Sequence, residues 1–376
     1  MKAGTRETAA ALTGFTVGVT AARRREELTA LLRRRGARVV EAPTLRIVPL
    51  ENDAELRAAT ERCLAAPLDY VVATTGVGWR GWMSAAEGWG RGAALTAACR
   101  EARVLSRGPK ATGAVRASGM TEAWSPASEA VDELRDHLLG HELAGRRVAV
   151  QEHGTPLPGF VAALRERGAE VVEVPVYRWA PAEDLDPARR LAESTARGDV
   201  HALLFTSAPA ITSFLDQAAA TGRYEAVLAR LRTDVLPLCV GPVCARPLHD
   251  AGVEPIWPER GRLGAMVHLL TAELPARDRH SIPTPDGELT LQGNALLLGE
   301  EAVWLTPTSA GVLRALAERP GWVVSRPDLL RRVWPGQEAD EHAVETAVTR
   351  LRAALGPLAG LVRTVPKRGY RLEAGR

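Results

Sequence analysis

A segment near the start of the chain is repeated in its middle. Residues 14–43 contain GFTVGVT followed by EELTALLRRRGARVVEAP, and residues 145–175 contain GRRVAVQ followed by FVAALRERGAEVVEVP. Each copy predicts a buried strand, a helix with one apolar face and, after a glycine that ends the helix, a second strand. Because strands that alternate with helices pair in parallel, we expect a duplicated α/β unit.

Two shorter blocks recur in the same order. DYVVATTGVG, from Asp69, resembles HALLFTSAPA, from His201, and a Gly-Pro turn followed by a second glycine occurs at residues 108–119 and again at residues 241–252. In parallel sheets, ligands bind beyond the carboxyl ends of the strands, near helix N-termini. The residues expected to contact a ligand there are Thr75, Gly76, Lys110, Thr112, His153, Ser207 and Cys244. The alternative is that the hydroxyl groups only cap helices and that His153 lies in solvent.

The composition and the motifs that the sequence lacks mainly exclude classes of function. Lys and Arg number 48 against 45 Asp and Glu, so a nucleic-acid-binding surface has to be local. The four cysteines have neither a CxxC nor a zinc-site spacing, which predicts buried, reduced thiols in a cytoplasmic protein without a metal site. An apolar run of about 18 residues and a signal peptide are both missing, which predicts no membrane segment. Phosphate-loop, dinucleotide and catalytic-triad patterns are missing too, so no cofactor is expected.

The duplicated pattern, with the PVYR segment at residues 175–178, resembles uroporphyrinogen-III synthase over about residues 12–274. The resemblance implies two pseudo-repeated α/β domains with parallel sheets, joined by a two-stranded ladder. The implied ranges are 12–43 with 181–274 for one domain, 48–175 for the other, and 42–50 with 174–181 for the ladder. Trp79 and Trp82 are expected near the mouth of the ligand crevice.

The same resemblance implies an activity. Members of the family cyclise hydroxymethylbilane without a metal or cofactor, and Tyr177 occupies the position of a tyrosine proposed to assist loss of the leaving hydroxyl. The family's threonine in each Gly-Pro-x-Thr-Ala turn is replaced here, by Ala111 and by Cys244. Because these replacements remove hydroxyl donors, we expect binding of a related ligand rather than catalysis. Tyr177 is therefore a ligand-binding candidate, and a catalytic one only if activity is retained.

The C-terminal part has a different pattern. A polar, proline-containing stretch at residues 275–283 predicts a linker. Short alternating segments then predict antiparallel strands at residues 289–291, 295–298 and 302–305. Three helices are predicted to begin after Thr306, Ser325 and Asp340, with a short strand at residues 322–324, Pro335–Gly336 ending the second helix, and a hairpin over residues 361–372.

The third of these helices has one apolar and one polar face. Val344 begins the apolar face, and the side chains on the opposite side and its flanks, at about 100° per residue, are His342, Thr346, Thr349, Arg350 and Arg352. Such a surface suits a helix that enters the major groove, because these side chains donate to base edges or phosphates. Solvation alone is the alternative, so the surrounding pattern has to decide.

The order of elements and three motifs resemble the OmpR/PhoB-type winged-helix DNA-binding domain over about residues 284–374. The motifs are LTPTxxxVLxxLxxxPGxVVSRxxLLxxVWPG, VxxxVxRLRxxLG and RTVxxRGYRL. The resemblance makes the third helix a recognition helix within a domain at residues 284–376, and it implies DNA contacts at His342, Thr349, Arg350, Arg352, Thr364, Lys367, Arg368 and Tyr370. Ser309 and Pro366–Lys367 depart from the family pattern, which favours an altered operator sequence over loss of binding.

Together the two parts predict a transcription regulator whose synthase-like unit senses a ligand or binds a partner. By resemblance to bacterial regulators of this architecture, the expected process is nitrate and nitrite assimilation. The alternative is an active uroporphyrinogen-III synthase with a DNA-binding tail. The expected partners are promoter DNA, a tetrapyrrole-like small molecule, an OmpR-type nitrogen regulator and a second copy of the chain, with no membrane association.

Overall fold

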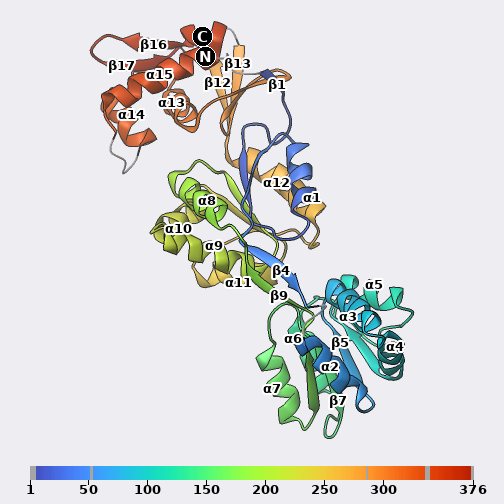
Figure 1. Cartoon of the computed structure of the whole chain (residues 1–376). Helices are drawn as coiled ribbons and strands as arrows, with labels where there is room; N and C mark the ends of the chain where they lie inside the picture. Colours follow the sequence, from blue (N-terminus) through green and yellow to red (C-terminus); the bar gives the residue numbers. More distant parts are fainter. Residues whose placement is uncertain (1–5, 51–53, 285–286, 335–338, 374–376) are drawn as a thin grey trace. The chain divides into compact units, whose positions relative to one another are not determined.

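A computed structural model describes residues 6–50, 54–284, 287–334 and 339–373 (Figure 1). The chain divides into two compact units, of which one is Leu45–Pro181 and the other combines Met1–Thr44 with Ala182–Arg376. The larger unit contains an α/β domain, called here the first, and a C-terminal winged helix. The smaller unit contains the second α/β domain.

The second α/β domain is built on a four-stranded parallel sheet. Its strands, in spatial order, are β6 (Arg103–Ser106), β5 (Tyr70–Ala73), β7 (Arg147–Gln151) and β8 (Glu170–Val174). Its helices are α2 (Ala54–Leu64), α3 (Gly76–Gly88), α4 (Gly92–Glu101), α5 (Pro109–Ala117), α6 (Val131–Leu139) and α7 (Pro158–Glu166). β5 reads YVVA and is buried at every position, as a strand covered on both faces should be. Helices α2 to α5 contribute one apolar cluster, and α6 and α7 contribute the other.

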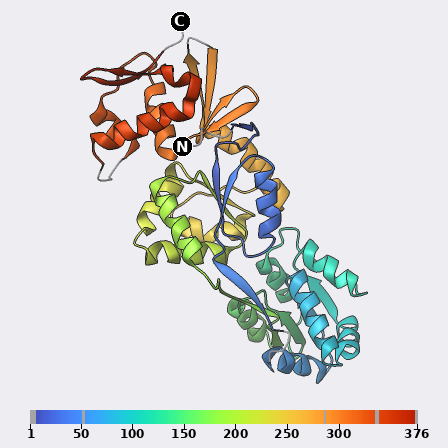
Figure 2. The ribbon, with the colours of Figure 1, turned by 45° about the horizontal axis from the view of Figure 1, so that its top comes forward.

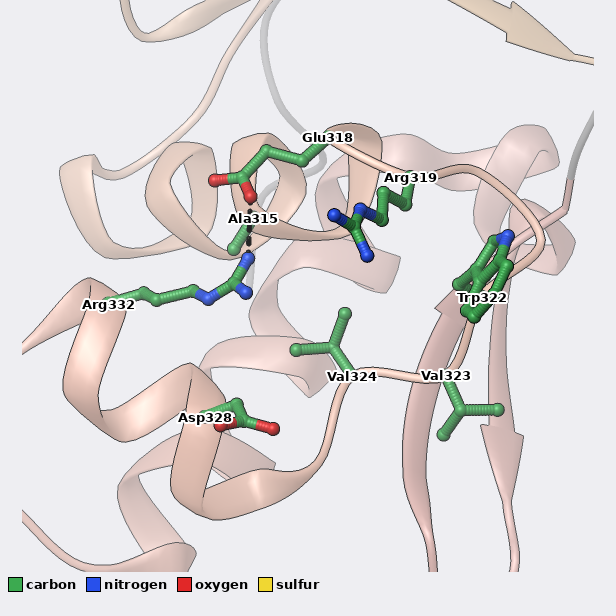
Figure 3. A pocket seen from close by; sticks show the side chains of 8 residues that line it. All are labelled: Ala315, Glu318, Arg319, Trp322, Val323, Val324, Asp328 and Arg332. Carbon is green, nitrogen blue, oxygen red and sulfur yellow. Dashed lines mark hydrogen bonds and ion pairs between the residues drawn. The ribbon is translucent and has the colours of Figure 1, made fainter.

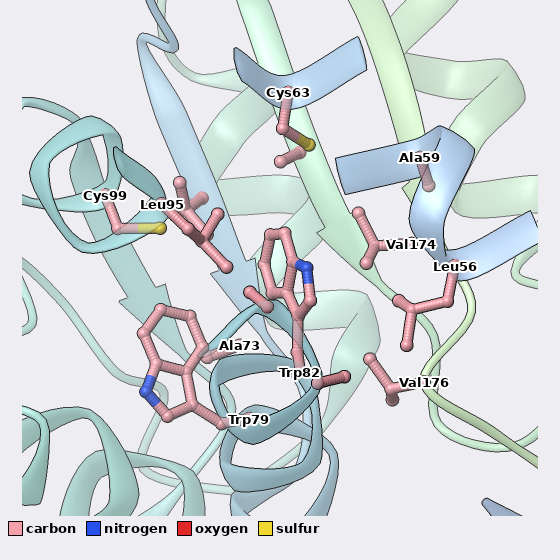
Figure 4. Close-up of a cluster of buried hydrophobic side chains, with 14 of the residues drawn as sticks. Leu56, Ala59, Cys63, Ala73, Trp79, Trp82, Leu95, Cys99, Val174 and Val176 are labelled. Carbon is pink, nitrogen blue, oxygen red and sulfur yellow. The ribbon is translucent and has the colours of Figure 1, made fainter. Parts of the chain in front are cut away.

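The cluster beside α3 contains the two tryptophans expected at a crevice mouth (Figure 4). Trp79 and Trp82 are fully buried and meet edge to face, with ring centroids 6.1 Å apart. Their indole N–H groups donate to Ser118 Oγ at 3.0 Å and to Thr60 Oγ1 at 2.9 Å. The expectation is therefore wrong: both rings belong to the core, where buried indoles need an internal hydrogen-bond partner.

The first α/β domain repeats this architecture. Its parallel sheet has the order β11 (Leu236–Cys239), β10 (Ala202–Phe205), β2 (Thr16–Val19) and β3 (Arg38–Glu41). Its helices are α1 (Arg25–Arg33), α8 (Asp186–Arg197), α9 (Ala208–Ala220), α10 (Tyr224–Thr233), α11 (Pro242–Asp250) and α12 (Leu263–Arg277). Helices α1 and α12 cover one face of the sheet and α8 to α11 the other, as Figure 2 shows. β2-α1-β3 and β7-α7-β8 are the two copies predicted from the repeat.

A two-stranded antiparallel ladder connects the domains along the chain. It pairs β4 (Leu45–Pro49) with β9 (Tyr177–Pro181), residue for residue, from one end to the other. The two parallel sheets, this ladder and the winged helix confirm the predicted fold class.

The winged helix begins with an antiparallel sheet. Its strands, in spatial order, are β1 (Arg6–Thr8), β15 (Glu301–Trp304), β14 (Ala295–Leu298), β13 (Gly287–Gln292) and β12 (Arg279–Thr284). Helices α13 (Pro307–Ala317), α14 (Arg326–Val333) and α15 (Glu341–Leu355), a short 3₁₀ helix (Gly356–Leu361) and the hairpin β16 (Val362–Val365) with β17 (Gly369–Leu372) follow. Thr306, Ser325 and Asp340 each accept a backbone N–H from three residues later, which confirms the predicted helix starts. Pro335 and Gly336 lie outside the described residues.

Two expectations for this region need correction. The predicted linker at residues 275–283 is regular structure, because α12 runs to Arg277 and β12 pairs with β13 along its whole length. β12 is an edge strand with only Ile282 and Thr284 buried, and such strands tolerate proline and polar residues. The strand predicted at residues 322–324 reduces to one bridge, between Val324 and Tyr370. Within the described ranges, no helix has the length and apolar character needed to cross a membrane.

Candidate DNA interface and candidate ligand edges

Helix α15 presents a polar face at the surface of the winged helix. Its apolar face is buried against the other helices, while His342, Thr349 and Arg350 are exposed and Thr346 is partly exposed. Thr349 donates its hydroxyl proton to the Glu345 carbonyl at 2.9 Å, so its oxygen is oriented as an acceptor toward the outside. The structure thus brings together four of the five side chains predicted on this face.

The fifth side chain, Arg352, has a different environment. Its guanidinium donates to the Val362 carbonyl at 3.0 and 2.7 Å and to Thr364 Oγ1 at 2.9 Å. It also lies 5.9 Å from the centre of the Tyr370 ring, which is 4% exposed. These contacts hold the hairpin against α15. Of the predicted DNA contacts, Arg352 and Tyr370 are therefore engaged within the protein, whereas Thr364 remains exposed.

The tip of the hairpin carries exposed positive charge. Lys367 and Arg368 both lie in solvent. Lys367 has a φ of 61°, in the left-handed region, and Arg368 N–H closes the turn by donating to the Val365 carbonyl at 3.0 Å. The tight turn therefore presents two cations next to each other, which suits a phosphate backbone.

Two pockets lie on the winged-helix domain near these elements. One is lined by Thr306, Thr308, Trp334, Ala343, Thr346, Ala347 and Arg350, and it places the start of α13 beside the polar face of α15. The other is lined by Ala315, Glu318, Arg319, Trp322, Val323, Val324, Asp328 and Arg332 (Figure 3). An ion pair of 2.6 Å between Glu318 and Arg332 spans the second pocket, and the Trp322 ring beside it is 69% exposed.

The carboxyl edge of the second sheet holds a polar network. Thr75 caps α3 by accepting the Gly78 N–H at 3.2 Å, and the buried Gln151 amide donates to Thr75 Oγ1 at 3.0 Å. Thr112 is hydrogen-bonded to Ser106, with 2.6 Å between the hydroxyl oxygens. These hydroxyls act partly as caps and cross-links. Lys110 is exposed.

Gly76 lies where helices α3 and α5 approach closely. A Cβ at this position would lie 2.2 Å from the Lys110 carbonyl, so only glycine fits.

Arg107 was not predicted from the sequence, although it directly precedes the Gly108–Pro109 turn. It is partly buried, and its guanidinium makes no hydrogen bond or ion pair with the described residues. Burial lowers the pKa of its guanidinium, against the opposing influence of Tyr177 and Glu129. Burial and the Arg107 charge lower the pKa of His153 to about 4, so this imidazole is neutral near neutral pH. His153 Nδ1 is buried without a hydrogen-bond partner among the described residues.

Tyr177 lies near Arg107 and the loop that carries His153. Its side chain is 4% exposed and meets Trp179 edge to face, with ring centroids 6.1 Å apart. Gly154 follows His153 with a φ of +96°, and a Cβ there would lie 2.7 Å from Tyr177 Cε2. The glycine therefore allows the loop that carries His153 to rest on the tyrosine ring. His153 thus lies against protein and not in open solvent.

At the carboxyl edge of the first sheet, the surroundings of the Gly-Pro turn are less polar. Ser207 precedes α9 and is partly exposed, but its side chain makes no capping hydrogen bond. Cys244 is 5% exposed, and its thiol donates to the Phe205 carbonyl at 3.6 Å. A hydrogen bond to Cys244, together with burial, raises the pKa of Cys239 far above its usual value. Both thiols therefore point into the domain. Across the described ranges, no cluster of three or more His, Cys, Asp or Glu side chains suits a metal ion.

Comparisons with known proteins agree with this division of the chain. Residues 26–268 match the family of uroporphyrinogen-III synthase HemD, and residues 299–372 match the C-terminal domain of transcriptional regulatory proteins. A mutant uroporphyrinogen III synthase from the extremely thermophilic bacterium Thermus thermophilus is similar in structure, with a TM-score of 0.57 and 30% identity over 69% of this chain and 98% of that chain.

Two curated relatives cover the two parts. The uncharacterized protein YjjA of Bacillus subtilis is 29% identical over 260 residues, which are 68% of this chain and 94% of that protein. The transcriptional regulatory protein AfsQ1 of Streptomyces coelicolor is 38% identical over 93 residues, which are 23% of this chain and 41% of that protein.

The fold and the two surfaces define a double α/β unit that carries a DNA-binding domain of the winged-helix class. The chain belongs to the uroporphyrinogen-III synthase HemD family, and its C-terminal domain is an OmpR/PhoB-type DNA-binding domain.

Proposed function

We propose that this protein is a transcription regulator that reads promoter DNA with α15 and the β16–β17 hairpin, while its HemD-like unit senses a ligand or binds a partner. The observation that carries the proposal is the exposed set of His342, Thr349 and Arg350 on α15, beside the cationic hairpin tip. Side chains on a helix that can hydrogen-bond to base edges, together with positive charge on a neighbouring hairpin, are the two parts that sequence-specific binding requires.

Footprinting followed by fluorescence anisotropy tests the DNA-binding part. We expect His342→Ala and Arg350→Ala each to lower discrimination between operator and random DNA by about 1–3 kcal/mol. Lys367→Gln or Arg368→Gln should instead weaken binding to all sequences and reduce the slope of log affinity against log salt by about 0.9. Arg223→Gln, at an exposed arginine before α10, is the control. Unchanged discrimination in both α15 variants contradicts the proposal.

For the HemD-like unit we propose an anionic, tetrapyrrole-like ligand. Arg107 offers guanidinium donors that no described residue uses, and the Thr75 and Thr112 hydroxyls lie at the same sheet edge. Carboxylates suit such a group because arginine binds them with two parallel hydrogen bonds. Calorimetric titration of uroporphyrin III into the full chain tests this, because Trp79 and Trp82 are too deeply buried to report binding by contact quenching. Absence of saturable heat argues for the partner-binding role instead.

The proposed physiological process is nitrate and nitrite assimilation. Its support is the combination of a HemD-like unit with an OmpR/PhoB-type domain in one chain. A lone winged helix reads a short half-site, so a second copy or an OmpR-type nitrogen regulator is proposed on the adjacent half-site. Deletion of the gene, followed by transcript measurement with and without nitrate, tests the process. An unchanged nitrate response contradicts it.

A further inference from the structure

The winged helix is attached to the first α/β domain by more than the chain itself. Only Asp278 separates the end of α12 in the domain from the start of β12 in the winged helix. Arg314 of α13 donates from Nη2 to both carboxylate oxygens of Asp278, at 3.1 and 3.0 Å. The same nitrogen lies 3.2 Å from the Gly293 carbonyl. One guanidinium therefore ties a helix of the winged helix to the connection and to the β13–β14 turn.

A second group of contacts joins the β13–β14 turn to the segment before β2. The Gln292 side chain, 2% exposed, donates to the carbonyls of Ala11 and Thr13 at 3.2 and 2.8 Å. The Asn294 N–H donates to the Gly14 carbonyl at 2.8 Å. The Gln292 amide and the Asn294 N–H therefore find their acceptors in backbone carbonyls of the other domain, where burial would otherwise leave them without a partner.

The two backbones also touch directly at Gly14 and Gly293. Gly14 has a φ of +95°, and a Cβ there would lie 2.0 Å from the Gln292 carbonyl oxygen. Gly293 has a φ of +52°, and a Cβ there would lie 2.6 Å from the Gly14 carbonyl oxygen. Only glycine permits both the backbone conformation and this approach.

His201 connects this interface to the sheet of the first domain. It directly precedes β10, and its Nδ1 accepts the N–H of Thr16, the first residue of β2, at 3.0 Å. Burial and the Arg314 charge lower the pKa of His201, while Asp278 opposes them. The Arg314–Asp278 pair is thus close to the amino ends of the two central strands. Each strand is four residues long, or about 13 Å, and its other end is the candidate ligand edge.

We infer that these contacts form an interdomain interface that makes the winged helix and the first α/β domain one cooperative body instead of two tethered modules. Resting on the proposed function, the inference extends to signalling: β2 and β10 connect the carboxyl edge of the first sheet, where Ser207 follows β10, to the interface at their amino ends. The DNA-binding domain then responds to the HemD-like unit through direct packing, without a flexible linker.

Hydrogen–deuterium exchange of the full chain tests the inference at peptides covering residues 10–16 and 290–296, one from each domain. We expect Arg314→Ala, a change on the winged-helix side, to speed exchange in both peptides by about tenfold or more, since a charged hydrogen bond is lost. Gly14→Ala, a change on the α/β side, should affect both peptides too. Glu273→Gln, which removes an exposed ion pair within α12, is the control and should affect neither.

Faster exchange in residues 290–296 alone after Arg314→Ala overturns the inference, and this variant decides the matter if Gly14→Ala does not fold. Promoter binding is measured in the same samples. If exchange becomes faster in both peptides but the protein does not bind promoter DNA, the interface is supported and the proposed function is rejected. If exchange becomes faster in one peptide only and promoter binding is retained, the interface is rejected and the proposed function is unaffected.

Discussion

The two α/β domains place the same turns at the carboxyl ends of their sheets but fill them with different side chains. Gly108 and Gly241 precede α5 and α11 with almost the same extended backbone, at φ 174° and 175°. In the second domain the turn follows Arg107, whereas in the first domain the equivalent residue is Val240. Hydroxyls and an amide lie near the turn in the second domain, and buried thiols lie near it in the first.

The difference shows what a duplicated fold preserves. Backbone conformation is retained because glycine and proline at these turns determine where each helix begins. The side chains around the turn differ: a partly buried arginine and hydroxyls lie beside it in the second domain, whereas Val240 and buried thiols lie beside it in the first. We therefore expect the anionic part of a ligand to bind beside Arg107 in the second domain.

The largest effect on the free energy of unfolding is expected from a substitution in the core of the second domain, beneath its polar edge. Trp82→Ala removes a fully buried ring and the partner of Thr60, and it should lower the free energy of unfolding by about 3–5 kcal/mol. Chemical denaturation followed by circular dichroism measures this. Trp322→Ala removes an exposed ring and should change stability by less than about 0.5 kcal/mol. Equal losses in the two variants would show that burial does not distinguish them.

The next effect tests the polar edge directly. Arg107→Gln should weaken binding of a polycarboxylate such as uroporphyrin III by about tenfold or more, because a charge-assisted hydrogen bond contributes about 1.5–3 kcal/mol. Val240→Ala, at the equivalent place in the first domain, should leave affinity nearly unchanged. Arg80→Gln, at an exposed arginine of α3, controls for net charge. If Val240→Ala weakens binding as much as Arg107→Gln, the proposed asymmetry is wrong.

A smaller effect concerns pH. His153 has a pKa lowered to about 4 from an ordinary value of 6.5, so it stays neutral in the folded chain over a range in which the unfolded chain takes up its proton. The free energy of unfolding should therefore fall as the pH drops from 6.5 toward 4, and no further contribution arises above 6.5.

Denaturation of the His153→Gln variant at several pH values measures this contribution. We expect its pH dependence to be flatter than that of the wild type, while His268→Gln, at an exposed histidine of α12, should match the wild type. The same slope in all three proteins would mean that His153 is not held neutral by the fold.

The smallest expected effect on stability comes from a substitution that gives the carboxyl edge of the first sheet a hydroxyl, as the second sheet has. Cys244→Thr replaces a buried thiol with a hydroxyl and adds one methyl group, and the hydroxyl has the Phe205 carbonyl as an acceptor. Stability should change by less than about 1.5 kcal/mol, because the hydroxyl donates to the carbonyl that the thiol uses. Ligand titration of the variant then shows whether the first edge gains affinity. A large loss of stability would indicate that the contact between Cys239 and Cys244 is essential.

The sequence alone determined most of the secondary structure. Its repeat, GFTVGVT with GRRVAVQ, predicted two copies of strand, helix and strand, and Thr306, Ser325 and Asp340 predicted three helix starts, all of which the structure confirms. These signals are local, since periodicity and capping depend on residues within a few positions of one another. The side chains on the polar face of α15 were predictable from the sequence for the same reason, because the helical periodicity alone determines which of them share a face.

The tertiary structure decided what depends on contacts between distant segments. Trp79 and Trp82 belong to the core because α2 and the residue after α5 supply Thr60 and Ser118 to their indole groups. Arg352 faces the hairpin, and the stretch at residues 275–283 is a helix end and an edge strand. Arg107 is distinguished by a partly buried guanidinium that makes no hydrogen bond or ion pair with the described residues, which no spacing along the chain reveals. Helical and strand periodicity are properties of neighbouring residues, whereas burial and partnership are properties of the packed fold.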